Sequence, residues 1–569
     1  MTSYLIRISK QLNISYISSP DIGFLRGLKE PFASTKTSLV FRFLDQDGYE
    51  PSTKKSYGFL LSNLTYIKTF ASAILVPKVY VWPVDETSYL LPHTNLVADA
   101  HRNELQVFAY GFANDKINVH NYSYNPITEY LSFIDNGNFS VDGVVSDFPL
   151  TSSAARECFA HLRHSASVQA MPKPLVISNC GASGIYPGCT DLAYKKAISD
   201  GTDAIDCPVH MSKDGVPFCS SSVDLMANTF VYQTEFRKFA SVINEIQSNT
   251  GIFSFSLNWS DIQALTPALS NPYGQLGLFG NPKYSKSGKI VSLSEFLDIA
   301  KNASSVSRVL IKMENARYLA ENQGMSIVNS VLVALRDSHI QFLRSDERIM
   351  IQSTSSAVLK AMKGKGFELV YEVHEAIEVI DSEVIEDIKC FAHSVVLNKD
   401  SVFFNSNGFL RSWTHVVDYF HAFLIPVYIQ GFRNEYVSIP YDFYYDPVVE
   451  INSYVRLARV EGLITAFPQT AVDYRNNRCL TLDKKVKYME AKIPGELVSL
   501  VPDELRPALP EAFPNLTEGE VLEPALPPVV SNASLHHSPP PQVAATSTSA
   551  LLPRQLTAFL SCLYIVLSL

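Results

Sequence analysis

Short apolar runs recur along the second half of the chain and alternate with helical patterns. Runs of a few apolar residues predict strands that are buried on both faces. The intervening patterns predict helices, as in LAYKKAISDG at 192–201, which ends on a C-capping glycine. Eight parallel strands alternating with helices over about 300 residues predict a (β/α)8 barrel of the TIM type, an α/β fold. The predicted strands are 175–177, 204–205, 309–313, 349–352, 369–373, 395–397, 427–429 and 463–465.

The same hydrophobic pattern appears twice in the chain. Residues 94–149 align with residues 414–468 almost without gaps, as in VDGVVSDFPLT against VEGLITAFPQT. Each match covers a helix, an apolar strand, a second helix and another strand, an order that implies parallel strands with right-handed crossovers. His101 and His421 recur in both copies, and we expect them to be packed or surface histidines of helices.

The repeat divides the chain into two copies of one barrel. We expect a complete second barrel at 166–485, with an insertion at about 223–299. The first copy, 1–165, has room for only the last four or five strands, which predicts a truncated barrel. Residues 486–547 are rich in Pro, Glu, Ser and Val, a composition that favours an extended stalk.

Charge and cysteine content narrow the classes of protein. A net charge of −9 argues against nucleic acid as a partner, because phosphate binding needs a basic surface. No stretch of about 20 apolar residues occurs inside the chain, so no membrane span is predicted. The eight cysteines contain no CxxC pair, so a structural zinc site is not expected. Four cysteines fall within forty residues, and one or two disulfides among them are expected in an oxidising compartment; their pairing stays open: Cys180, Cys189, Cys207 and Cys219.

The C-terminus has the pattern of a lipid-anchor signal. Residues 556–569 are almost wholly apolar, and the small-residue run AATSTSA precedes them at 544–550. This arrangement predicts a glycosylphosphatidylinositol (GPI) signal at 548–569, with attachment at Ala545 or Ser547. An amphipathic or core helix is the alternative.

The N-terminus lacks the apolar segment of a secretory signal, so we expect that the chain lacks its true beginning. Sequons support export to the extracellular face of the plasma membrane. They lie at Asn13, Asn63, Asn121, Asn138, Asn258, Asn302, Asn515 and Asn532.

The start of the second copy carries the most distinctive residues. The run LVISNCGASGIYPGCTDLAYKKAISDGTDAIDCPVHMSKDGVPFCSSSVDL occupies 175–225. It closely resembles the opening of glycerophosphodiester phosphodiesterases. The whole chain resembles the plant GPI-anchored glycerophosphodiesterase-like proteins with two tandem domains. The resemblance implies that a signal peptide and the first three strands of barrel one precede this chain.

The same resemblance implies a catalytic pattern at the C-terminal mouth of the barrel. The family uses His-Arg after strand one, Glu-x-Asp on strand two, a His after the KDG turn and a Glu on strand three, together with a divalent cation. The His-Arg pair falls on Asn179 and Cys180, and the later His falls on Ser221. The metal-binding positions fall on Asp206, Pro208 and, for the strand-three Glu, Lys312.

Most of this chemistry is therefore absent from the sequence. Neither Asn nor Ser transfers a proton near neutral pH, and losing one acid or base costs about 10²–10⁴ in rate. Two alternatives remain. His210 lies two residues beyond Pro208 and is a candidate for a displaced base. The ammonium of Lys312 is a candidate to replace the cation and neutralise Asp206.

We expect a weakly active or inactive cell-surface protein of this family. The GPI lipid would hold it on the outer leaflet, where it would act in cell wall organisation, with a wall polysaccharide or a phosphodiester as ligand. The alternative is an active phosphodiesterase that releases glycerol 3-phosphate and an alcohol, with Ca²⁺ or Mg²⁺ as cofactor and a site around Asp206 and His210. A structural spacer without ligand is the third possibility.

Overall fold

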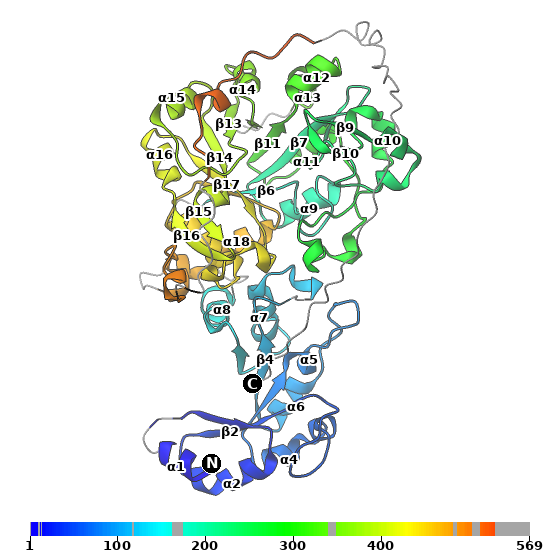
Figure 1. The fold of residues 1–569 in the computed structure, drawn as a ribbon. Coiled ribbons are helices and arrows are strands. Elements are labelled where there is room, and N and C mark those ends of the chain that lie inside the picture. Colours follow the sequence, from blue (N-terminus) through cyan, green and yellow to red (C-terminus); the bar gives the residue numbers. More distant parts are fainter. Residues whose placement is uncertain are drawn as a thin grey trace, which may run out of the picture.

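The chain forms two units, each built on a parallel sheet (Figure 1). The structure is a computed structural model. It describes residues 2–9, 12, 14–116, 119–161, 174–339, 349–481, 486–502, 504 and 513–529.

The second unit is a closed barrel of eight parallel strands. Their order around the barrel is β11-β12-β13-β14-β17-β18-β6-β7, and the pairing of β7 with β11 closes it. All eight predicted strands are confirmed. They are β6 (Leu175–Ser178), β7 (Ala204–Met211), β11 (Arg308–Met313), β12 (Ile349–Ser353), β13 (Glu368–Glu372), β14 (Ser394–Asn398), β17 (Val427–Phe432) and β18 (Gly462–Thr465).

Helices surround this barrel on the outside (Figure 1). They are α9 (Asp191–Ser199), α11 (Leu293–Lys301), α12 (Ala316–Asn322), α13 (Ile327–Asp337), α14 (Ser356–Met362), α15 (Ser382–Phe391), α16 (Val416–Ala422), α17 (Pro447–Arg456) and α18 (Pro468–Asn476). A hairpin of β15 (Phe403–Ser406) and β16 (Phe409–Trp413) lies between β14 and α16.

One apolar layer fills the barrel interior. Each strand contributes one buried residue to it, so the barrel is a packed core and not a pore. The residues are Ile177, Ala204, Leu310, Met350, Val370, Val396, Tyr428 and Ile464. Polar side chains follow two residues later on several strands, at the carboxyl ends, because side chains with a period of two point to the same face.

The first unit is an open sheet of five parallel strands in the order β1-β2-β3-β4-β5. The strands are β1 (Tyr16–Ser19), β2 (Ser38–Arg42), β3 (Ala73–Pro77), β4 (Gln106–Phe112) and β5 (Gly143–Ser146). Its helices are α1 (Thr2–Ser9), α2 (Ile22–Phe32), α3 (Tyr57–Leu61), α4 (Leu64–Lys68), α5 (Lys78–Val81), α6 (Leu96–Arg102), α7 (Pro126–Ile134) and α8 (Pro149–Ala154).

The repeat seen in the sequence is a structural repeat. The series α6, β4, α7, β5, α8 of the first unit corresponds to α16, β17, α17, β18, α18 of the second. His101 and His421 lie on α6 and α16, and both contact an acid across the turn before the last strand. The distances are 2.9 Å from His101 Nε2 to Asp142 Oδ2 and 3.2 Å from His421 Nε2 to Glu461 Oε2. Both are surface histidines of helices, as expected.

The predicted insertion has its own small core. It contains the β9 (Ser241–Ile243) and β10 (Gln247–Gly251) hairpin and the helix α10 (Trp259–Gln263), and the short strand β8 (Pro217–Cys219) leads into it from β7. Its buried residues form a cluster separate from the main core: Phe218, Leu225, Val231, Ile252, Leu257, Ile262, Leu265 and Ile290.

The described part of the segment expected to be a stalk packs on the second barrel. Tyr488 is buried and donates to Asp446 Oδ2 at 2.7 Å. Leu516 forms a bridge with Ile380, and α19 (Glu518–Val521) contacts α15. The structure thus differs from the expectation over residues 486–529, because apolar side chains within the Pro-rich composition find partners. The remaining stalk residues and the predicted GPI signal, including Ala545 and Ser547, lie outside the described residues.

Equivalent residues of the two units meet where the units touch. Asn114 Nδ2 donates to the carbonyl oxygen of Tyr444 at 2.8 Å, and its counterpart Asn434 Nδ2 donates to the carbonyl oxygen of Ser123 at 2.9 Å. In the repeat, Ser123 is the counterpart of Tyr444. Each unit therefore gives and receives the same hydrogen bond, as in a two-fold symmetric interface.

A disulfide between Cys158 and Cys479 joins the two units covalently. The bonded cysteines are 321 residues apart in the chain.

Candidate functional site at the mouth of the second barrel

A small cavity lies at the carboxyl ends of the second barrel's strands. Its volume is about 90 Å³. The structure brings all six family-equivalent positions together around it: Asn179, Cys180, Asp206, Pro208, Ser221 and Lys312. The remaining lining residues are Leu310, Glu314, Gln352, Gln430 and Ile464.

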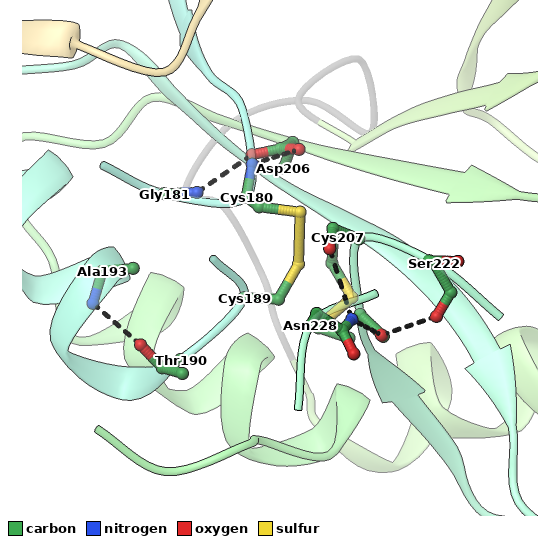
Figure 2. The surroundings of a disulfide bond; sticks show 12 residues. Cys180, Gly181, Cys189, Thr190, Ala193, Asp206, Cys207, Ser222 and Asn228 are labelled. Atoms are coloured by element: carbon green, nitrogen blue, oxygen red, sulfur yellow. Dashed lines mark hydrogen bonds between the residues drawn. A yellow bond between two sulfur atoms is a disulfide. The ribbon is translucent and has the colours of Figure 1, made fainter. Parts of the chain in front are cut away.

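Asp206 organises the loop that follows β6. Its carboxylate accepts hydrogen bonds from Ser178 Oγ at 2.9 Å, from the Cys180 N–H at 2.8 Å and from the Gly181 N–H at 3.3 Å. Figure 2 shows this carboxylate above the Cys180–Cys189 disulfide, which closes the loop. Both of its oxygens are engaged, so Asp206 stabilises the loop.

The backbone of this loop requires a glycine. Gly181 has a φ of +72°, and a Cβ there would lie 2.6 Å from the carbonyl carbon of Ala193. Only glycine avoids both the left-handed strain and this contact. The GASG motif therefore has a structural cause in the close approach of the loop to α9.

Burial determines the charge state of Asp206. The side chain is 5% exposed, and burial raises its pKa to about 6, against the hydrogen bonds from Cys180, Ser178 and Gly181, which lower it. No cation lies beside it among the charged side chains that the structure describes.

Lys312 pairs with Glu314 and Glu372, and the expected ion pair with Asp206 is wrong. The ammonium lies 2.7 Å from Glu314 Oε1 and 2.9 Å from Glu372 Oε2. Burial by itself lowers the pKa of Lys312, but the two carboxylates outweigh this effect and raise it. Glu372 is available because β13 ends inside the mouth, while the carboxylate of Asp206 is directed to the loop after β6.

Glu372 is the centre of a network that spans four strands. Its carboxylate accepts from Lys312 on β11, from Gln352 Nε2 on β12 at 2.8 Å and from Gln430 Nε2 on β17 at 3.1 Å. The Glu372 side chain is 2% exposed. Such a carboxylate is fully satisfied inside the protein.

The other family-equivalent residues supply no acid or base. Asn179 and Ser221 are exposed at the rim, and Ser221 Oγ accepts from Asn228 Nδ2 at 3.2 Å. The sulfur of Cys180 is bonded to Cys189. A second disulfide, Cys207–Cys219, fixes β7 to β8, so all four clustered cysteines are paired.

His210 points into the protein and not into the cavity. It is 1% exposed, it is not among the lining residues, and its Nε2 has no hydrogen-bond partner among the described residues. Burial lowers its pKa to about 4, so the imidazole is neutral at neutral pH. A base must reach the proton that it removes.

The donor set of the mouth does not fit a divalent cation. Ca²⁺ and Mg²⁺ prefer several carboxylate or carbonyl oxygens. Asp206 has both oxygens engaged, Pro208 has no ligating side chain, and the ammonium of Lys312 already occupies the space between Glu314 and Glu372. The ammonium of Lys312 thus takes the place that a metal ion would need between those two carboxylates.

Sequence analysis missed Glu314, Glu372, Gln352 and Gln430. A signal was available for each of them. Glu314 lies two residues beyond Lys312 and Glu372 lies at the end of a predicted strand, and polar residues at the carboxyl ends of barrel strands line the mouth.

The closed parallel barrel with its polar carboxyl end defines an α/β barrel protein of the TIM type. The model of the glycerophosphoryl diester phosphodiesterase family matches residues 181–470. The chain belongs to this family.

Plant relatives match along the entire chain. It is 48% identical to glycerophosphodiester phosphodiesterase GDPDL3 from Arabidopsis thaliana over 569 residues, which is all of this chain and 75% of that protein. Glycerophosphodiester phosphodiesterase GDPDL1 from the same plant is 47% identical and covers all of this chain and 74% of itself. A solved structure, a glycerophosphoryl diester phosphodiesterase from Silicibacter pomeroyi, aligns with 53% of this chain and 93% of its own at 16% identity and a TM-score of 0.38.

Proposed function

We propose that this chain is a member of its family with little or no phosphodiesterase activity, and that it binds and organises wall material at the outside of the cell. The observation that carries the proposal is the Lys312–Glu372–Glu314 cluster in the barrel mouth. The ammonium of Lys312 lies between the two carboxylates and offsets one of their two negative charges, which weakens the attraction of the mouth for a cation.

The lost groups argue for a very low rate. Asn179 and Ser221 stand where the resemblance requires two histidines, and each lost acid or base costs about 10²–10⁴ in rate. The arginine that would stabilise phosphoryl charge is replaced by Cys180, which is held in a disulfide.

The small size of the mouth cavity also supports a very low phosphodiesterase activity. Ligand sites usually measure about 300–1,000 Å³. The mouth cavity, at about 90 Å³, has room for about three water molecules at about 30 Å³ each. A glycerophosphodiester does not fit without displacement of the surrounding loops.

Two features support an extracellular location. The three disulfides are typical of an oxidising compartment. The sequon asparagines within the described residues are all exposed: Asn63, Asn121, Asn138, Asn258, Asn302 and Asn515. Asn13 and Asn532 lie outside the described residues. No helix of the described residues is long and apolar enough to cross a membrane, and we propose a GPI lipid as the attachment to the outer leaflet.

The relatives' names suggest the rival function, hydrolysis of glycerophosphodiesters to glycerol 3-phosphate and an alcohol. A rate assay separates the two. The full chain is incubated with glycerophosphocholine in Ca²⁺, in Mg²⁺ and in chelator, and we expect rates equal to buffer in all three. A chelator-sensitive rate that Asp206→Ala abolishes and Glu235→Ala preserves would establish the rival; Glu235 is an exposed acid of the insertion.

The anchor has its own test. A full-length precursor expressed in plant cells is treated with phosphatidylinositol-specific phospholipase C. Release from the membrane fraction is the expected result. Retention after treatment would refute the GPI attachment and leave the barrel assignment unaffected.

A further inference from the structure

A larger cavity lies between the two units and shares no lining residue with the cavity at the barrel mouth. Its volume is about 350 Å³, within the range of small-molecule sites. One wall comes from the first unit's loop before α7. The other comes from the loop after β6, the start of α18 and the insertion near residues 281–284.

Aromatic rings supply flat surfaces in this cavity. The Tyr186 and Tyr284 rings lie 4.6 Å apart between centroids at 35°, and Phe467 and Tyr89 complete the apolar part of the lining. Aromatic faces of this kind combine an apolar surface with hydroxyl groups at the edge. The C–H face of a pyranose ring is the matching partner.

The polar part of the lining is rich in amides. Asn125 and Asn434 are both buried at the back of the cavity. Asn434 directs its amide nitrogen to Ser123 and Thr470, and its carbonyl oxygen has no partner among the described residues. Amide groups that accept and donate fit the hydroxyls of a sugar.

The charge of the lining is unusual for an acidic protein. The chain carries a net charge of −9, yet the lining contains two lysines and no carboxylate. Lys196 is paired with Asp200, which lies outside the lining. Lys283 has no carboxylate within 4.0 Å among the described residues, and its ammonium lies over the Tyr284 ring at 5.8 Å, so its charge is not neutralised by an acid and can attract an anion.

The walls are held in place before any ligand arrives. The Lys283 N–H donates to the Tyr89 hydroxyl at 3.0 Å, and that hydroxyl also bonds to Asn281. Tyr124 donates to the carbonyl oxygen of Phe279 at 2.6 Å. Bonds between the units thus fix the insertion against the first unit, and a preformed cavity lowers the entropic cost of binding.

We propose that this cavity binds an anionic saccharide, with a uronic acid ring against Tyr284 and Tyr186 and its carboxylate on Lys283. The inference goes beyond the proposed function, because it concerns a different cavity and holds whether or not the barrel mouth hydrolyses phosphodiesters.

The test is a calorimetric titration of the disulfide-intact full chain with trigalacturonic acid. Lys283→Gln and Tyr284→Leu should each weaken binding at least tenfold. Lys286→Gln is the matched control, because Lys286 belongs to the same loop, contacts Phe230 and does not line the cavity. Its affinity should equal that of the unchanged protein. Higher salt should weaken binding through the loss of charge attraction.

Two further ligands identify which chemistry is recognised. Maltotriose, a neutral trimer, should bind more weakly than the uronide and should be insensitive to Lys283→Gln. Glycerol 3-phosphate should not bind at this position. The proposal is overturned if the uronide fails to bind, if Lys283→Gln leaves its affinity unchanged, or if glycerol 3-phosphate binds as tightly with the same dependence on Lys283.

One alternative occupant comes from the chain itself. Asn121 is exposed at the rim of this cavity and belongs to a sequon, so a glycan there has access to the interior. The titration is therefore repeated with Asn121→Gln made in the same eukaryotic host. Equal affinity supports an external saccharide. Uronide binding that appears only in Asn121→Gln shows that the protein's own glycan fills the cavity and overturns the proposal.

Discussion

The two units share a buried ion pair but differ at the positions that face the barrel mouth. Lys78 follows β3 and pairs with Glu129 on α7, and in the second unit Lys399 follows β14 and pairs with Glu450 on α17. The same pair therefore ties a strand end to a helix in both units.

The mouth positions have diverged instead. By sheet register, Arg42 of the first unit occupies the position of Glu372, and Tyr110 occupies that of Gln430. In the first unit the Arg42 guanidinium lies over the Tyr110 ring at 4.9 Å, whereas in the second Gln430 donates to Glu372. Both copies of the repeat keep the ion pair inside the unit, and they differ at the positions that face the mouth.

The described residues of the first unit contain no counterpart of β6, β7 and β11, the strands that carry Asn179, Asp206 and Lys312. Among the described residues, the repeated part of the fold supplies the ion pairs and the contacts between the units, and the residues equivalent to the family's catalytic positions lie on the second unit.

The largest expected effect is loss of the covalent link between the units. Replacing Cys158 and Cys479 by Ser should cost about 3–5 kcal/mol, because the bond closes a very long loop. Calorimetry should then show separate transitions for the two units. Cys390→Ser, at a free and exposed thiol, is the control and should change nothing. A single unshifted transition in the double variant would show that the link is dispensable.

The two ion pairs should differ in strength. Lys399→Met leaves Glu450 buried without a partner, with an expected loss of about 3–5 kcal/mol of unfolding free energy. Lys78 is more exposed than Lys399, at 25% against 13% of the side chain, so Lys78→Met should cost about half as much. Urea denaturation measures both. A larger loss of unfolding free energy in Lys78→Met than in Lys399→Met would show that burial does not set the strength of these ion pairs.

Asp206 should give the second unit a stability that falls as pH rises. Its folded pKa of about 6 lies above the ordinary value of 3.8 for an aspartate, so between these values the folded state binds more protons than the unfolded state. The contribution is fully present below pH 3.8 and is lost as pH rises through 6. This contribution to the free energy of unfolding is about 2–3 kcal/mol, because a difference of one in pKa corresponds to about 1.36 kcal/mol.

Asp206→Asn should remove this slope. Urea midpoints measured from pH 4 to pH 7 give the difference between the two proteins. Asp446, whose pKa burial also raises to about 6, is present in both and cancels. A parallel pair of curves would mean that Asp206 does not titrate in this window.

The smallest effects concern the reciprocal bonds between the units. Asn114 also donates to Thr151 Oγ1 at 2.9 Å, and Asn434 donates to Thr470 Oγ1 at 3.0 Å. Asn114→Ala and Asn434→Ala should each cost about 1–2 kcal/mol, and by equal amounts. Thermal midpoints measure the two losses, and a marked inequality would break the symmetry of the interface.

The sequence predicts the fold well because its signals are local. The strands at 175–177 and 309–313 are apolar runs. Right-handed crossovers between consecutive parallel strands then predict their order around the barrel. The predicted set of mouth residues also comes together, since every member lies on a strand of the sheet or just beyond one.

The partners in the mouth could not be predicted. Lys312 on β11 and Glu372 on β13 have one strand, β12, between them, so their ion pair depends on the register of the sheet. The pairing of Asp206 with the loop after β6 likewise depends on backbone N–H directions. The packing of the described residues within 486–529 on the second barrel could not be predicted either, because their Pro-rich composition is typical of an extended segment.

We propose that the ion pairs of Lys312 replace a metal in the mouth of the second barrel. The measurement that decides this proposal is the thermal midpoint of the full chain in millimolar Ca²⁺ or Mg²⁺, compared with chelator, in the unchanged protein and in Asp206→Ala. A ligand that binds only the folded state raises the midpoint. We expect any difference in thermal midpoint between metal and chelator to be the same in the unchanged protein and in Asp206→Ala. A metal-dependent rise that Asp206→Ala abolishes would contradict it.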